Sequence, residues 1–235
     1  MTSVMVVTGY TPLGVLNMSN EKFRELGAQL IEACADGGAL VHSFDGFPLH
    51  DVWLYRWLFE NDRLDIEPAR PVAPDRFKTM LHKVQSDCMQ NQKMEWVRSA
   101  YADNPVEADV YVWIDYGVLK QQGMSKEVIT RFIQKVIAFP PTDKIISPGL
   151  RDLDKEDHQH SWERFTGALH VIPRQFVTKM ALAMADEATA MIRQTNRLWF
   201  ETDTLVHLER RNELPFQHYR CWWGASIFEN YKGPE

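Results

Sequence analysis

The sequence predicts an α/β protein with a mainly parallel central sheet flanked by helices. Two observations predict this fold class. Within the first 45 residues, a short apolar strand, an amphipathic helix and a second strand follow one another, which is the order in which parallel sheets begin. Further along, the run Val110–Ile114 consists of apolar, β-branched and aromatic residues and predicts a strand buried on both faces. Because no composition break or repeat divides the 235 residues, we expect a single domain spanning 1–235.

The N-terminal elements are predicted from apolar patterning and from glycines. Residues 4–7 predict the first strand, and a helix is expected from about Asn20 until Gly37 and Gly38 end it. A second strand is expected at residues 39–44. Neither the GxGxxG fingerprint nor a GxxxxGK loop occurs, which disfavours a classical dinucleotide-binding fold and a P-loop NTPase. The expected apolar face of the helix consists of Phe23, Leu26, Leu30, Ile31 and Cys34.

The middle of the chain predicts two helices around the Val110–Ile114 strand. Residues 47–59 are aromatic without a clear period, and residues 62–74 form a polar, proline-bearing stretch, so both are expected to be irregular. One long helix is expected over residues 75–100. Ser125 is the expected N-cap of a second helix, which carries one apolar stripe and ends before two prolines.

The last third predicts shorter elements. We expect short strands at residues 144–146 and 169–172, separated by a charged, histidine-bearing loop at 152–163. A helix is expected over residues 174–193, because its apolar residues recur at helical spacing. The tail from Trp199 combines aromatic and acidic residues with a short helical pattern.

Charge and cysteine content restrict the class of protein. The net charge of −6 provides no overall basic field for nucleic acid or an anionic membrane. The three cysteines are widely spaced and form no metal or redox motif, which favours a reducing compartment, and Cys34 is expected in the core. We find neither a signal-peptide pattern nor an apolar run long enough for a transmembrane helix, so we expect a cytoplasmic protein.

Asp115 is the first candidate site residue, because it ends the most apolar strand of the chain. Ligands of open α/β sheets bind just outside the carboxyl ends of the strands. A carboxylate at this position can hold a divalent cation or a sugar hydroxyl. Alternatively, Asp115 only caps a turn in which Gly117 supplies a positive φ.

A resemblance is carried by six segments taken in order: residues 6–10, 91–96, 100–104, 112–117, 199–205 and 216–219. Together they resemble GT-A-type glycosyltransferases, and most closely the bacterial HtrL/YibB-type proteins. The strand that reads Trp-Ile-Asp-Tyr-Gly here, residues 113–117, corresponds to a family strand that reads approximately Trp-Ile-Asp-Ala-Gly. The preceding helical residues, the first strand with its loop, and two C-terminal stretches are also similar to the family.

This resemblance implies a single GT-A-like (Rossmann-like) domain, with a nucleotide-sugar donor half at 1–120 and an acceptor half with a C-terminal tail at 121–235. It implies transfer of a sugar from a nucleotide-diphosphate donor, with a UDP-sugar expected, to a hydroxyl of a glycan or another acceptor, a modified DNA base included. Family members commonly use Mn²⁺ or Mg²⁺ bound at an Asp-x-Asp motif. Here Gly117 replaces the second acid, so that donor phosphates and water would complete the metal shell together with one carboxylate and one residue of the C-terminal tail. A metal-independent enzyme would instead need cationic side chains around the diphosphate.

The resemblance also suggests donor-binding residues. Thr8 and Tyr10 would contact the nucleobase, Lys93 the diphosphate or sugar together with Asp115, and Arg174 a phosphate. Each has a structural alternative, namely packing for Tyr10, a solvated side chain for Lys93 and an ion pair for Arg174.

Glu201 and Asp203 are the catalytic candidates, since either could take the proton of the acceptor hydroxyl as general base, with Asp203 favoured. The alternative is that Thr202 or Asp203 only caps a helix. His218 is the expected second metal ligand beside Asp115, unless it is a hydrogen-bonded structural histidine.

His158 and His160 could meet one metal ion, with Asp154 and Asp157 nearby. A solvated charged loop, or a lid over the donor, is the alternative for this stretch.

Two other classes of function stay open. A nucleotidyltransferase also needs a strand-end carboxylate and a metal, but the sequence has no glycine-rich phosphate loop near its start. A non-catalytic binding module with the same fold is favoured by the glycine at position 117.

Overall fold

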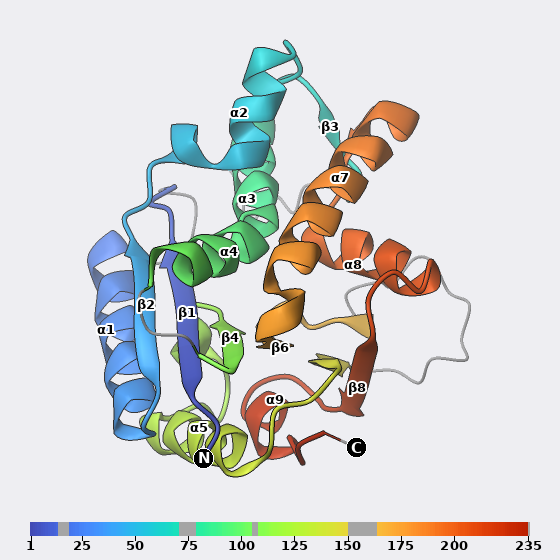
Figure 1. The fold of residues 1–235 in the computed structure, drawn as a ribbon. Coiled ribbons are helices and arrows are strands. Elements are labelled where there is room, and N and C mark those ends of the chain that lie inside the picture. The colour runs from blue at the N-terminus through green and yellow to red at the C-terminus, as the bar shows by residue number, and fades with distance from the viewer. Residues whose placement is uncertain (14–18, 71–78, 105–107, 150–163, 235) are drawn as a thin grey trace.

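The central element is a mixed, six-stranded sheet, formed by the residues that the computed structural model describes: 1–13, 19–70, 79–104, 108–149 and 164–234 (Figure 1). The strand order is β2-β1-β4-β6-β5-β8. Five of these strands run in the same direction and β6 runs against them, which follows from the pairing of neighbours. The α/β fold with a mainly parallel sheet is thus confirmed. The strands are β1 (Val4–Tyr10), β2 (Leu40–Asp45), β4 (Val110–Ile114), β5 (Ile145–Gly149), β6 (Leu169–Pro173) and β8 (Phe216–Arg220).

The reversed strand β6 determines where Arg174 lies. In the antiparallel register of β4 and β6, Ile114 pairs with Leu169 and Val110 pairs with Pro173. Arg174 therefore follows β6 at the edge where β4 begins, and its backbone N–H donates to Asp109 O at 3.0 Å. At about 3.3 Å per residue, this edge is roughly 16 Å from the carboxyl end of β4.

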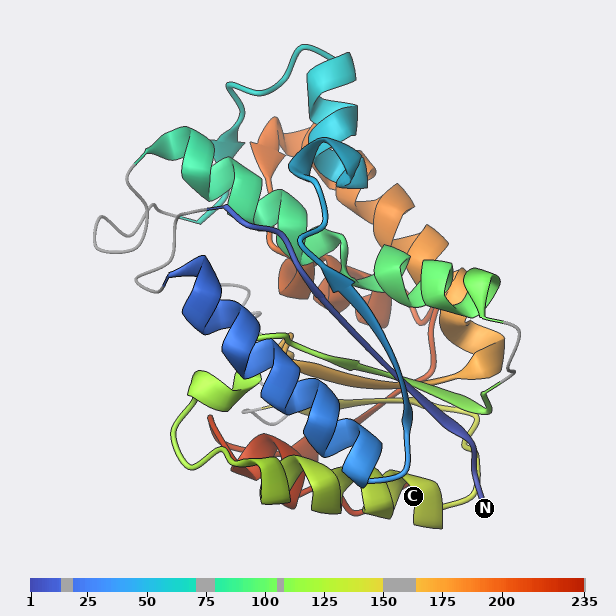
Figure 2. The ribbon, with the colours of Figure 1, turned by 90° about the vertical axis from the view of Figure 1, so that its left-hand side faces the viewer.

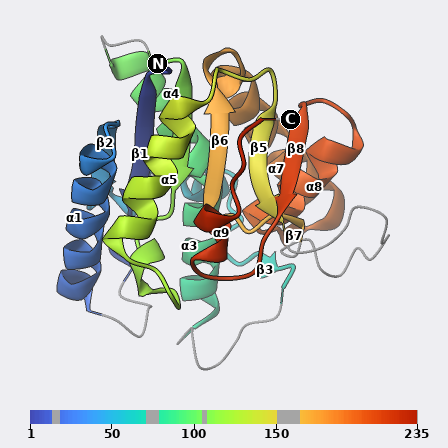
Figure 3. The same cartoon turned by 90° about the horizontal axis from the view of Figure 1, so that it is seen from below.

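One face of the sheet is covered by α1 (Asn20–Asp36), α5 (Lys126–Ala138) and the short α9 (Ser226–Glu229) (Figures 2 and 3). Ser125 caps α5 as predicted, since its side chain accepts a hydrogen bond from Val128 N at 3.4 Å. Both long helices turn their apolar stripes toward the sheet. The core between them includes Val6, Leu30, Cys34, Val112, Phe132 and Phe228.

The opposite face is covered by α4 (Lys93–Asp103), α7 (Val177–Thr195) and α8 (Glu201–Arg210). The predicted helix at 174–193 begins with a 3-10 turn (Arg174–Phe176) before α7. The core of this layer is rich in tryptophan and methionine. It includes Trp96, Trp113, Val97, Met180, Met184 and Leu205.

A smaller unit at one end combines α2 (Trp53–Glu60), α3 (Met80–Asn91) and the two-stranded sheet of β3 (Glu67–Pro68) and β7 (Arg197–Leu198) (Figure 1). Two expectations were wrong here. The aromatic stretch expected to be irregular contains α2. The helix expected over 75–100 is, in its described part, two helices that meet at Gln92, and residues 75–78 lie outside the described residues. Gln92 Oε1 accepts from the backbone of Trp53 at 2.8 Å, so a contact with α2 fixes the junction.

Two further predictions concern membranes and cysteines. In the part of the chain that the structure describes, no helix has the length and apolar character needed to cross a membrane. Cys34, Cys88 and Cys221 are unpaired and buried, as predicted for Cys34.

Candidate functional site

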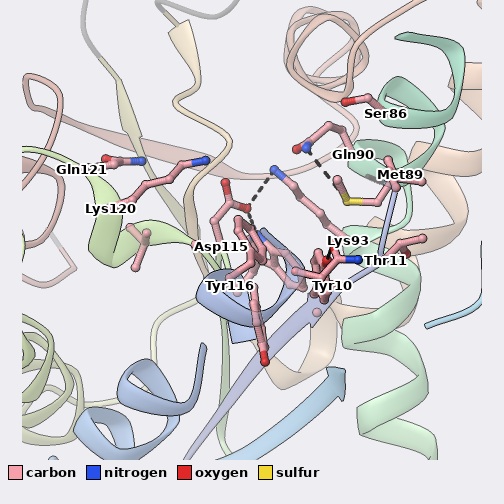
Figure 4. Close-up of a pocket in the computed structure, with 17 residues that line it drawn as sticks. Tyr10, Thr11, Ser86, Met89, Gln90, Lys93, Asp115, Tyr116, Lys120 and Gln121 are labelled. Atoms are coloured by element: carbon pink, nitrogen blue, oxygen red, sulfur yellow. Dashed lines mark hydrogen bonds and ion pairs between the residues drawn. The ribbon is translucent and has the colours of Figure 1, made fainter. Parts of the chain in front are cut away.

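A pocket opens at the carboxyl ends of the parallel strands β1 and β4 (Figure 4). Its walls come from the residues after β1, the first turns of α1, one face of α3, and the turn after β4. That turn contains a 3-10 segment, η2 (Val118–Lys120). This is the position at which open α/β sheets bind their ligands. All the residues that line the pocket fall between positions 9 and 121.

Asp115 lies on this pocket and is held by two donors. Its Oδ1 accepts from Trp113 Nε1 at 2.9 Å and lies 3.0 Å from Lys93 Nζ. The Asp115 side chain is 33% exposed, whereas the Lys93 side chain is 4% exposed. Asp115 is therefore the more exposed member of a charged network that is otherwise buried, and its carboxylate is accessible from the pocket.

Lys93 stands at the centre of this network, at the first residue of α4. Its ammonium also donates to Glu201 Oε1 at 2.7 Å and to the carbonyl of Gly167 at 2.9 Å. Three oxygens thus surround an ammonium that has three N–H groups. Burial by itself would lower the pKa of Lys93, but the carboxylates of Asp115 and Glu201 outweigh it and raise this pKa. Lys93 therefore stays charged.

Glu201 is the most buried acid of the network, at 2% exposure. Its second oxygen, Oε2, is buried and has no hydrogen-bond partner within the described ranges. Burial raises the pKa of Glu201 to about 7, although the charge of Lys93 opposes this rise. The single ammonium of Lys93 faces two carboxyl groups and cannot neutralise both. Because burial raises the pKa of Glu201, this carboxyl group takes up a proton near neutral pH.

Three aromatic rings form one wall of the pocket, namely Tyr10 at the end of β1, Phe23 in α1 and Tyr116 after β4. The ring centroids of Tyr10 and Phe23 are 4.7 Å apart, and those of Tyr10 and Tyr116 are 5.5 Å apart in a stacked arrangement. Tyr10 also donates a hydrogen bond to Asn20. A flat, apolar ligand group can pack against such a wall.

Gly117 has a packing role that differs from the expected one. Its φ is −96°, so the predicted positive φ is wrong. A Cβ at this position would lie 2.7 Å from the ring of Phe23, closer than packed atoms come. The space that a second acid would need is therefore occupied by Phe23. The turn itself was expected, and Asp115 O accepts from Val118 N at 2.9 Å.

The side chains at the pocket fit a divalent cation only if the bound nucleotide and water supply most of the oxygen atoms that coordinate it. Among the described residues, no group of three or more His, Cys, Asp or Glu side chains could hold a metal ion. Asp115 supplies one carboxylate, and the position of a second acid is closed by Phe23. Mg²⁺ in nucleotide sites is commonly held by one or two carboxylates together with substrate phosphates and water. Asp115 fits a cation of that kind.

His218, the second predicted ligand, is on β8. Its Nε2 lies 2.9 Å from Glu209 Oε1, and Glu209 also pairs with Arg164. Burial would raise the pKa of Glu209, but its hydrogen bonds to His218 and Arg164 lower it to about 2. These contacts match the structural alternative for His218, and its metal role stays a prediction. His158, His160, Asp154 and Asp157 lie outside the described residues.

The remaining predicted residues, Asp203, Thr8 and Arg174, do not line the pocket. Asp203 accepts from Arg70 at 2.8 Å and from Phe200 N at 3.1 Å, so it occupies the helix-capping position that was the alternative. Thr8 is fully buried. Arg174 lies at the opposite edge of the sheet, with its guanidinium 5.9 Å from the ring centre of Tyr101.

Sequence reasoning missed Lys120, which comes from η2 and extends toward Asp115 in Figure 4. Its ammonium lies 5.5 Å from the ring centre of Phe23, and within the described part of the chain it has no carboxylate at ion-pair distance. The sequence could have indicated Lys120, because it lies five residues after Asp115 in the same turn.

Comparison with known proteins establishes the fold. No protein-family model and no curated protein matches the sequence. One solved structure, of a glycosyltransferase involved in the glycosylation of the major capsid of PBCV-1, is similar with a TM-score of 0.54 and 10% identity. The match covers 93% of this chain and 81% of that one. The apo form of mouse xyloside xylosyltransferase 1 has 8% identity over 93% of this chain and 84% of its own, with a TM-score of 0.43, too low to establish a common fold.

The protein therefore has the GT-A-like α/β fold that the sequence predicted. At 10% identity, the likeness to the capsid-modifying enzyme is one of fold.

Proposed function

We propose that the protein is a glycosyltransferase that transfers a sugar from a nucleotide-diphosphate donor, uridine-based, to an acceptor hydroxyl. The observation that carries this proposal is the Asp115 carboxylate, which meets the pocket at the carboxyl ends of β1 and β4 in a GT-A-like fold. We also propose the family expected from the sequence, the HtrL/YibB-like glycosyltransferases. The pocket residues fall almost wholly within the proposed donor half, 1–120.

The donor would lie between the aromatic wall and the charged network. The nucleobase would pack near Tyr10, as predicted from the sequence, and the diphosphate would lie beside Asp115 and Lys120. The ammonium of Lys93 has three oxygen neighbours, so we propose that it acts mainly by orienting Asp115 and by its charge. Lys120, which has no carboxylate at ion-pair distance among the described residues, would contact the diphosphate directly.

A divalent cation, Mn²⁺ or Mg²⁺, would neutralise the negative charge that develops on the departing nucleoside diphosphate. Asp115 is the described residue that would hold it. The general base stays a prediction. Glu201 has a pKa near 7, which suits proton transfer at neutral pH, but it is separated from the pocket by Lys93. Asp203 is engaged by Arg70 and by the start of α8.

The test is release of nucleoside diphosphate from a panel of nucleotide-sugars, with and without Mn²⁺, by the wild type and Asp115→Asn. We expect release from at least one donor, reduced at least about 100-fold in Asp115→Asn with the fold retained. Asp109→Asn is the matched control, since Asp109 precedes the same strand at its opposite end and bonds Ser3. Normal turnover by folded Asp115→Asn contradicts the site.

Two other outcomes would replace the proposal. Donor binding without turnover in any combination would indicate the non-catalytic binding module, which the closed second-acid position favours. Release of pyrophosphate from a nucleoside triphosphate and a sugar phosphate would indicate a nucleotidyltransferase.

A further inference from the structure

Two adjacent tryptophans, Trp222 and Trp223, are among the most exposed large apolar side chains of the described residues, at 72% and 50%. They follow β8 directly. Because β8 runs in the same direction as β4, its carboxyl end lies at the edge of the sheet where Asp115 lies (Figure 3). The two indoles are thus on the same side of the molecule as the pocket.

The turn that carries these indoles is fixed by hydrogen bonds on several sides. The hydroxyl of Ser226 accepts from Trp222 N at 2.7 Å and donates to Trp222 O at 2.6 Å. The preceding residue, Cys221, is buried, and its N–H donates to Gly149 O at 2.9 Å. A turn held in this way presents its two tryptophans to solvent as a defined feature of the fold.

The turn also contacts the segment that closes the pocket. Ala225 N donates to Gln122 O at 3.3 Å, and Gly224 packs so closely on the same carbonyl that a side chain there would collide with it. Gly224 has a φ of +76°, which glycine adopts without strain. Gln121, the neighbour of Gln122, lines the pocket. The turn that carries the tryptophans is therefore in direct contact with the residue that follows the last pocket-lining residue.

We propose that Trp222 and Trp223 form the acceptor subsite and bind a pyranose ring of a glycan acceptor by stacking. This inference rests on the proposed function, and it names the acceptor class. The face of an indole ring is electron-rich, and the C–H groups on one face of a pyranose are its weakly positive partners. Tryptophan combines such a face with a polar N–H, which suits a ligand that is apolar on its faces and polar at its rim.

A second observation supports a hydroxyl-bearing ligand between the tryptophans and the donor pocket. Gln121 Oε1 is buried and lacks a hydrogen-bond partner in the described ranges. A buried acceptor of this kind costs free energy unless a ligand or water donates to it. A sugar hydroxyl is a donor of the required type, and Gln121 both lines the pocket and directly precedes Gln122, which the tryptophan turn contacts.

The size of the exposed surface favours a sugar over a second copy of the chain. Two tryptophans at these exposures present about 300 Å². A stable protein–protein interface buries about 800 Å² on each partner. A stacked pyranose needs only the area of one or two indole faces.

The test combines two binding measurements on the full chain. Labelled protein is applied to an array of immobilised pyranose oligosaccharides based on glucose, galactose, mannose, xylose and N-acetylglucosamine. We expect the wild type to bind a subset, with affinity reduced at least about tenfold in the double variant Trp222→Ala and Trp223→Ala. Replacement of both by tyrosine should restore binding in part. Phe59→Ala is the matched control, because Phe59 is 68% exposed on α2, which follows β2, and β2 and β8 are the outermost strands on opposite sides of the sheet.

Three results would overturn the acceptor subsite: wild-type protein that binds none of the oligosaccharides, equal binding by the double alanine variant, or tryptophan-dependent self-association or binding to phosphatidylserine vesicles in place of glycan binding. The second measurement is the thermal shift that UDP with Mn²⁺ produces in the same samples. If wild type shows no such shift with any nucleoside diphosphate, the proposed function fails, while the array decides the tryptophan subsite separately.

Discussion

Replacement of Glu201 by glutamine tests the charge balance of the buried network around Lys93. The Glu201 side chain is buried, with Oε1 2.7 Å from Lys93 Nζ and Oε2 without a partner among the described residues. Burial raises its pKa to about 7 against the opposing charge of Lys93, whereas in the unfolded chain a glutamate titrates near about 4.3. The folded state therefore binds more protons between these two pKa values. Stability is greatest below the lower value and falls as the pH rises through the higher one.

The size of the effect follows from the two pKa values. At about 1.4 kcal/mol per pKa unit, ionisation of Glu201 removes about 2–3 kcal/mol of stability between pH 5 and pH 8. Glutamine has nearly the same shape and can still accept from Lys93, but it has no proton to lose. Glu201→Gln is therefore expected to match the wild type within about 1 kcal/mol at pH 5 and to exceed it by about 2–3 kcal/mol at pH 8.

The assay is urea unfolding followed by circular dichroism at both pH values. Glu25→Gln is the exposed control, because Glu25 is more than half exposed in its pair with Lys22, and its effect should not change with pH. Equal pH dependence of wild type and Glu201→Gln would refute the reasoning, since it would mean that Glu201 is ionised in the folded protein throughout this range.

Three further substitutions address the pocket and its support. Lys120→Ala is expected to weaken UDP binding about tenfold in calorimetric titrations, whereas Lys126→Ala, on the exposed face of α5, should leave it unchanged. Gly117→Asp is expected to lower the free energy of unfolding in urea by about 1–3 kcal/mol through its contact with the Phe23 ring, and wild-type stability would contradict that packing. Asp203→Ala is expected to cost about 2–4 kcal/mol in the same assay, because it removes an ion pair and a helix cap, and a loss below about 0.5 kcal/mol would contradict both roles.

The elements with strong local patterns could be predicted from the sequence. The strand Val110–Ile114 is apolar throughout, and the helix after Ser125 combines an N-cap with one apolar stripe. The direction of β6 could not be predicted, because the pattern of Leu169–Pro173 is the same whichever way the strand runs. β8 was missed for a related reason, since it lies at the edge of the sheet and its pattern is half polar. Its pairing with β5 is a long-range contact.

The same distinction holds for the site. Asp115 could be predicted because the end of a strand is visible in the local sequence, and open α/β sheets in general bind their ligands at the carboxyl ends of the strands. The contact of Lys93 with Glu201 joins residues 108 positions apart, so the sequence suggested both residues but not their pairing. The sequence suggested a phosphate contact for Arg174 because it follows Pro173 at a helix start, and the reversed β6 places it at the other edge of the sheet.

The most direct test of the central claim is the thermal shift that nucleoside diphosphates and nucleotide-sugars produce, with and without Mn²⁺, in the wild type and in Asp115→Asn. A ligand at about 100 times its Kd stabilises the folded state by about 2.7 kcal/mol. For a chain of this length, that corresponds to a rise in Tm of roughly 5–10 °C. The account predicts such a rise for UDP or a UDP-sugar, larger with Mn²⁺, and its loss in Asp115→Asn. No rise with any nucleoside diphosphate in folded wild-type protein, or an equal rise in Asp115→Asn, would contradict it.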